Sequence, residues 1–175
     1  MTEVSESLQP SLSGDHISES LDSLAGENTT IHFLRHAPTK SSKEHKVQGK
    51  IDTDILSDEA VAYLEKVGAM NLQKPDLIVV SGLKRTQQTA DALKELLDWS
   101  DLAIIKDTAF NERSWGIFEG KTHEEVKSIL MQDPSLLEKY PYLNAGEFER
   151  IWSDPDFKVE GSESLNELAV RVNAG

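Results

Sequence analysis

An Arg-His pair follows a short apolar run near the start of the chain. Residues 31–35 read Ile-His-Phe-Leu-Arg, and His36 comes next. A run of this kind predicts a strand, and open α/β sheets bind ligands at the carboxyl ends of their strands. A neutral His can attack phosphorus and carry the phosphoryl group, while the planar guanidinium of Arg binds phosphate oxygens in two places. The pair indicates phosphoryl chemistry, with an ordinary strand-end His and a surface Arg as the alternative.

Two more candidate residues follow the next two apolar runs. Arg85 comes after the run at residues 75–82, and Glu112 after the run at residues 102–107. Cations are disfavoured in the first turn of a helix, so Arg85 in that position predicts an anion between its side chain and the helix. Glu112 would be an acid able to protonate a leaving oxygen. Taken singly, each is also the kind of charged residue found on solvated surfaces.

Strand and helix patterns alternate in the part of the chain that carries these residues. This order predicts βαβ units, so the expected fold is α/β, with three layers (α/β/α) and a mostly parallel sheet. The carboxyl ends of parallel strands meet at one edge, which would bring the candidate residues together. The expected strands are residues 31–35, 75–82 and 102–107, and the expected helices are residues 56–70 and 84–99.

The second half of the chain has a less regular pattern. Residues 121–131 predict a helix, and residues 133–157 predict short helical pieces because three prolines interrupt them. A last helix is expected to begin at Ser162 or Ser164, since Ser is a preferred N-cap. For the same reason Ser57 is the expected N-cap of the helix at 56–70.

The composition excludes several classes of protein. The formal net charge is −13, which argues against nucleic acid or an anionic membrane as a partner, so a phosphate site would have to be a local basic pocket. The chain has no Cys and no apolar run long enough to span a membrane. Residues 1–29 are rich in Ser and acidic residues and are expected to form a disordered tail, leaving residues 30–175 as one domain. We therefore expect a soluble cytoplasmic protein.

Three different motifs follow one another along the chain. They are Arg35-His36, then Ser-x-Leu-x-Arg-x-x-Gln-Thr from Ser81, then Asn-Glu-Arg-x-x-Gly-x-x-x-Gly from Asn111. In combination they resemble the histidine phosphatase superfamily, also called the phosphoglycerate mutase-like family, from about Ile31 to Val172. The resemblance implies the α/β fold of that family and a reaction that needs no metal or cofactor.

The resemblance also implies roles for individual residues. His36 would be the phosphorylated nucleophile, Arg35 and Arg85 the clamp on the phosphoryl group, and Glu112 the general acid and base. A softer match in the loop at residues 47–57 implies that Gln48 and Gly49 line the substrate pocket. Phosphatases of the family often have Gln before that Gly, whereas mutases more often have Thr, and Ser42 replaces a substrate-contacting Asn of the mutases.

One expected residue has no counterpart. The family has a second catalytic His on a later strand, but the five His of this chain are residues 16, 32, 36, 45 and 123. We therefore expect a truncated or incompletely predicted gene product that lacks a C-terminal strand. His123 with Glu124 and Glu125 suggests a solvated helix face more than a metal site, because no second His follows at helical spacing. His32 is expected in the core or in a second layer.

The leading functional expectation is a metal-independent phosphatase that acts on a small phosphorylated metabolite through a phosphohistidine at His36. A phosphoglycerate mutase-type phosphotransferase is a close variant, and an inactive phosphate-binding pseudoenzyme or an unstable fragment are alternatives from other classes. Residues 121–160 are expected to roof the pocket, with Trp115 and Trp152 in the core or in that roof. Substrate identity and oligomeric state are not readable from the residues.

Overall fold

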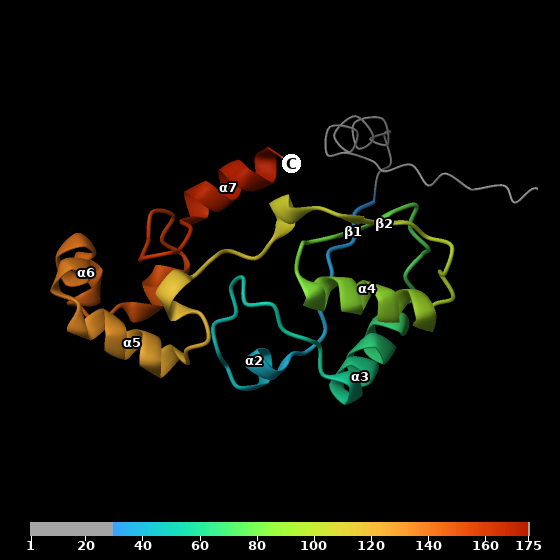
Figure 1. Ribbon diagram of the computed structural model, residues 1–175, viewed down its shortest axis with the longest axis horizontal. Helices are drawn as coiled ribbons and strands as arrows, with labels where there is room; N and C mark the ends of the chain where they lie inside the picture. Colours follow the sequence, from blue (N-terminus) through green and yellow to red (C-terminus); the bar gives the residue numbers. More distant parts are fainter. Residues whose placement is uncertain (1–29, 175) are drawn as a thin grey trace, which may run out of the picture. The chain divides into compact units, whose positions relative to one another are not determined.

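The computed structural model describes residues 30–174. Of these, Arg35–Ala174 form one compact unit (Figure 1). The disordered tail expected at residues 1–29 lies outside the described residues. Among residues 30–174, the helices are all too short or too polar to serve as a membrane span.

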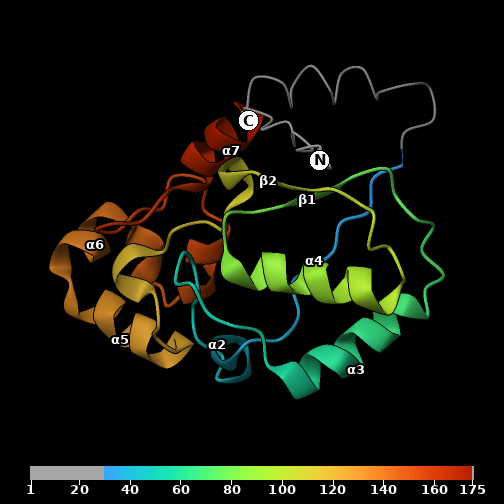
Figure 2. The same ribbon diagram turned by 45° about the vertical axis from the view of Figure 1, so that its right-hand side comes forward.

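Two of the expected strands form a small parallel sheet. Strand β1 (Ile78–Val80) pairs with strand β2 (Ile104–Lys106), with Ile78 opposite Ile104. Helix α4 (Lys84–Leu96) connects the two strands and packs against β1 (Figures 1 and 2). The α/β class and the parallel pairing expected from the sequence are confirmed.

The strand expected at residues 31–35 is not formed. Residues 30–38 have no regular secondary structure, and Ile31 and Phe33 are 67% and 92% exposed. His32, expected in the core or a second layer, is exposed. A strand needs a neighbour for its N–H and C=O groups, and the two strands among residues 30–174 pair with each other. An apolar run alone does not supply such a neighbour.

Helix α3 (Ser57–Gly68) packs on α4 and closes one core with it. Leu64 and Val67 of α3 meet Leu93 of α4, and Trp99 is buried beside them. The N-cap of α3 is Leu56, which makes no side-chain bond, so the expectation of Ser57 as the cap is wrong. Asp58 and Glu59 in the first turn instead suit the positive end of the helix dipole.

A second core lies among the helices of the chain's later half. The capping box of Thr122 and Glu125 starts α5 (His123–Gln132), and Asp133 caps α6 (Pro134–Lys139). The 3₁₀ helices η3 (Pro141–Leu143) and η4 (Phe148–Trp152) follow, as the proline-broken pattern predicted. The fully buried side chains of this core include Phe118, Leu130, Ile151 and Phe157.

Two α-helices and two 3₁₀ helices complete the described elements. Helix α7 (Leu165–Asn173) is capped by Ser164, with Glu167 completing a capping box, so Ser164 is the cap of the two candidates. Thr39 caps a short helix that the sequence patterns did not predict, α2 (Lys40–Lys43). The 3₁₀ helices η1 (Thr108–Phe110) and η2 (Gly116–Phe118) flank Glu112 on either side.

Candidate active site

A pocket of about 190 Å³ gathers five of the six predicted site residues. Its lining comes from the loop after residue 34, from the loop around residue 48, from the segment after β2 and from the helical roof. The predicted residues in it are Arg35, His36, Gln48, Gly49 and Glu112, and the others are Ser42, Lys46, Val47, Trp115, His123 and Trp152.

The hydrogen bond of His36 defines its tautomer. Its Nδ1 lies 2.7 Å from the carbonyl oxygen of Ala37, which can only accept, so Nδ1 carries the proton and Nε2 keeps its lone pair. Burial lowers the pKa of His36 below its ordinary value, and the positive charges of Arg85 and Arg35 act in the same direction. The bond to Ala37 and the charge of Glu112 oppose this shift without reversing it. The neutral, nucleophilic form is therefore favoured at neutral pH.

Helix α4 holds the loop that carries His36. The amide of Ala37 donates to Oγ1 of Thr89 at 2.9 Å, and the same hydroxyl donates to the carbonyl of Arg85 at 2.7 Å. Ala37 is fully buried, and Thr89 is 4% exposed. Sequence reasoning assigned no role to Thr89, although it is the last residue of the second motif. That position in the motif was the available signal.

Arg85 is buried but is not among the residues that line the pocket. Its guanidinium donates to the carbonyl of Ile51 at 2.9 Å and to that of Gly49 at 3.0 Å, while its Nε is buried without a partner. Arg85 therefore holds the loop that lines the pocket and acts on His36 through its charge. The predicted phosphoryl clamp stays a prediction. The carboxylate of Asp52 accepts the amide of Lys84 at this end of α4 at 2.7 Å, and the anion expected beside Arg85 stays a prediction.

Gly49 stands where no side chain fits. Its φ is +53°, and an added Cβ would lie 2.1 Å from Oε1 of Glu119. That oxygen accepts the amides of Lys50 and Trp115, each at 3.0 Å, so Glu119 joins the loop at residue 49 to the segment after Glu112. Gln48 also donates to Oγ1 of Thr39. Sequence reasoning missed Glu119, whose partners are backbone groups that leave no pattern in the sequence.

Positive and aromatic groups dominate the pocket. Among the residues lining it, Arg35 and Lys46 are cations and Glu112 is the one carboxylate, while Lys46 also pairs with Glu44, which is not a lining residue, at 2.7 Å. His123 is exposed, as predicted for a helix face, but it also stacks on Trp152 with ring centroids 4.9 Å apart. Trp152 meets Trp115 edge to face at 4.6 Å.

Glu112 is exposed, with firmly bonded residues on both sides. Asn111 accepts the amide of Gly82 at 2.6 Å through its Oδ1, which ties the segment to the end of β1. Arg113, 2% exposed, donates to the carbonyls of Phe157 at 2.8 Å and Glu163 at 2.7 Å. The backbone of Glu112 is thus placed by contacts that its neighbours make.

The proteins similar to this chain include phosphoglycerate mutases and a phosphatase. A 2,3-bisphosphoglycerate-dependent phosphoglycerate mutase of Rhodococcus jostii is 26% identical, over 82% of this chain and 62% of that protein. A glucosyl-3-phosphoglycerate phosphatase of Mycolicibacterium vanbaalenii is 36% identical, over 54% of this chain and 40% of that protein. The chain therefore spans less than two thirds of either relative.

A solved structure and a family model also match most of the chain. The structure of a mycobacterial glucosyl-3-phosphoglycerate phosphatase in complex with VO₃ matches with a TM-score of 0.62 and 26% identity, over 81% of this chain and 62% of the other. The family model of the histidine phosphatase superfamily (branch 1) matches residues 31–175. That match runs through all three motifs, of which the first and third bring Arg35, His36 and Glu112 to one pocket. The chain belongs to the histidine phosphatase superfamily.

Proposed function

We propose that the chain carries the phosphoryl-accepting site of a metal-independent phosphatase for a small phosphorylated metabolite. The single observation that supports this most is the state of His36. A proton held on Nδ1 by Ala37 and a lowered pKa leave Nε2 free to attack. This nitrogen belongs to a pocket that also holds Arg35 and Glu112.

The first step would form a phosphohistidine. Nε2 of His36 attacks phosphorus, the P–N bond forms, and the bond from phosphorus to the ester oxygen breaks. The leaving oxygen takes a proton from the carboxyl group of Glu112 and departs as an alcohol. Arg35 would stabilise the negative charge on the phosphoryl oxygens, which is the main task of the protein in phosphoryl transfer.

The second step would return the enzyme to its starting state. A water attacks phosphorus and gives a proton to the carboxylate of Glu112, and the P–N bond breaks. Phosphate leaves, and His36 and Glu112 regain their original protonation. A mutase would replace this water with a hydroxyl of a second substrate, and the mutase names among the relatives keep that variant open.

A phosphate-binding pseudoenzyme is the alternative from a different class of function. No His of the 175 residues lies beyond residue 123, so no residue here matches the second catalytic His implied by the resemblance. A pseudoenzyme reading predicts that the chain binds phosphate or vanadate without turning over a phosphate ester.

Phosphoryl labelling of His36 tests the proposal. The chain is incubated with a labelled phosphate ester, quenched, and assayed for acid-labile label, with His36→Ala as the test variant and His32→Ala, an exposed His, as the control. Label in the wild type and His32→Ala but not in His36→Ala is expected. Label that persists in His36→Ala contradicts the proposal, and vanadate binding without label or turnover favours the pseudoenzyme.

A further inference from the structure

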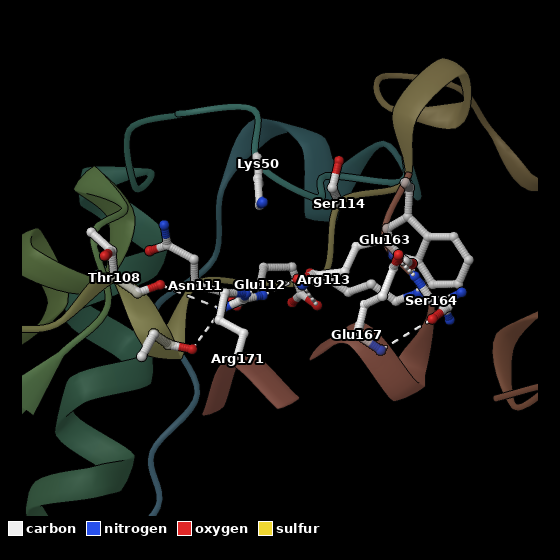
Figure 3. Close-up of polar contacts among 12 residues, drawn as sticks. Lys50, Thr108, Asn111, Glu112, Arg113, Ser114, Glu163, Ser164, Glu167 and Arg171 are labelled. Atoms are coloured by element: carbon white, nitrogen blue, oxygen red, sulfur yellow. Dashed lines mark hydrogen bonds and ion pairs between the residues drawn. The ribbon is translucent and has the colours of Figure 1, made fainter. Parts of the chain in front are cut away.

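We infer that Arg171 on helix α7 is a positioning residue that holds the backbone on the N-terminal side of Glu112 and so directs the Glu112 carboxyl into the pocket. This inference rests on the proposed function, since the proton transfer by Glu112 belongs to it. The contacts come from two segments about sixty residues apart in the sequence (Figure 3).

Arg171 contacts the loop before Glu112 through backbone oxygens. Its guanidinium donates to the carbonyl of Ala109 at 2.5 Å and to that of Asn111 at 3.0 Å, with a longer contact to Thr108 at 3.4 Å. The carbonyl of Asn111 belongs to the peptide that joins Asn111 to Glu112. Its orientation therefore bears directly on the direction in which the Glu112 side chain leaves the backbone.

Glu163 fixes Arg171 and holds the other side of Glu112. Its two carboxylate oxygens accept from Nε and an Nη of Arg171 at 2.8 and 2.7 Å, a bidentate pair that orients the planar guanidinium. The backbone of Glu163 accepts from Arg113 at 2.7 Å and donates to the carbonyl of Ser114 at 2.9 Å. The side chain of Arg171 thus holds Ala109 and Asn111, and the backbone of its partner Glu163 contacts Arg113 and Ser114, with Glu112 between the two groups (Figure 3).

This pair differs from the surface pairs of the chain. The side chains of Arg171 and Glu163 are 24% and 14% exposed, whereas those of Lys158 and Glu167, the latter also on α7, are 44% and 49% exposed. The bond to Glu163 raises the pKa of Arg171, and the charge of Glu112 adds to this rise.

The alternative is a purely structural role, in which Arg171 only holds helix α7 in place. Substrates with different leaving groups distinguish this role from the positioning of Glu112. A nitrophenolate leaves with little help from an acid, whereas an alkoxide must be protonated as it leaves. A misplaced Glu112 slows the phosphorylation of His36 by the second kind of substrate only, while a general loss of folded protein slows phosphorylation by both equally.

The experiment compares Arg171→Gln with Lys158→Gln in the full chain, on 4-nitrophenyl phosphate and glycerol 2-phosphate. We expect the ratio of kcat/KM for the alkyl ester to kcat/KM for the aryl ester, which reports the steps up to departure of the leaving group, to fall by about tenfold or more in Arg171→Gln. Lys158→Gln removes an α7-linked ion pair that does not touch residues 108–113, so its ratio should be unchanged. An equal loss on both esters in Arg171→Gln overturns the inference.

Amide hydrogen exchange tests the positioning without turnover. In Arg171→Gln the amides of Asn111 and Arg113 should exchange about tenfold faster, because the loop opens more often. The amide of Ala37, bonded to Thr89 in another part of the site, should be unaffected. Unchanged exchange at Asn111 and Arg113 overturns the inference. Faster exchange in a chain whose wild type hydrolyses neither ester would contradict the proposed function but leave the positioning contact established.

Discussion

The amide of Ala37 donates to the hydroxyl of Thr89 at 2.9 Å, although 52 residues separate them in the chain. Ala37 is the neighbour of His36 and the acceptor of its Nδ1 proton, so a residue of helix α4 sets the position of the proposed nucleophile. The hydroxyl of Thr89 also donates to the carbonyl of Arg85. The hydroxyl group therefore both accepts and donates a hydrogen bond inside the protein.

Thr89→Val should therefore leave the buried amide of Ala37 without a partner. We expect a loss of about 1–3 kcal/mol in the free energy of unfolding, measured by urea denaturation, because an unsatisfied buried donor carries its full desolvation cost. Phosphoryl labelling of His36 should weaken as well. Thr89→Ser, which restores the hydroxyl, should recover most of both losses, and a failure to do so would contradict this account.

Gly49→Ala should destabilise the loop beside the pocket. Both Gly49 and Gly146 have a positive φ, but a Cβ at Gly49 would overlap the Glu119 carboxylate, whereas the space around Gly146 is open to 4 Å. Each alanine should cost about 1–2 kcal/mol for the left-handed conformation. Gly49→Ala should cost more and also weaken vanadate binding, measured by calorimetry, and equal effects of the two variants would contradict the predicted overlap.

The lowered pKa of His36 predicts a direction for the pH dependence. Because only the neutral form can attack, kcat/KM or the labelling rate should fall as the pH drops through this pKa, which lies below the ordinary value of 6.5. The folded state also favours neutral His36, so its contribution to stability is present above the unfolded pKa and is lost as the pH falls through the folded one. NMR titration of the His36 ring measures the pKa directly, and a value above 6.5 would contradict the prediction.

Lys46 should contribute to anion affinity through its charge. Both lysines form ion pairs, Lys46 with Glu44 and Lys43 with Glu59, but Lys46 lines the pocket and Lys43 is not among the lining residues. Lys46→Met should weaken vanadate binding several-fold at low salt, and Lys43→Met should leave it nearly unchanged. The difference between the variants should shrink as ionic strength rises. Equal affinities in the two variants would show that Lys46 does not face the bound anion.

The sequence alone determined the features that depend on neighbouring residues. The helix of Lys84–Leu96, the capping boxes at Thr122 and Ser164, and the short helices that begin at Pro134 and Pro141 follow from local propensity and capping chemistry. The three motifs were sufficient to predict the family, and two of them carry side chains that line one pocket. These signals can be read within a window of about ten residues.

The tertiary structure decided the features that depend on contacts between residues far apart in the chain. The apolar run at residues 31–35 is not a strand, because periodicity cannot supply the second strand that such a run needs. Arg85 binds the carbonyls of Gly49 and Ile51, and Arg171 binds those of Ala109 and Asn111. Backbone carbonyls are present at every residue, so no residue type marks the ones that a distant arginine will contact. Only the folded chain, through the positions of its helices and loops, selects them.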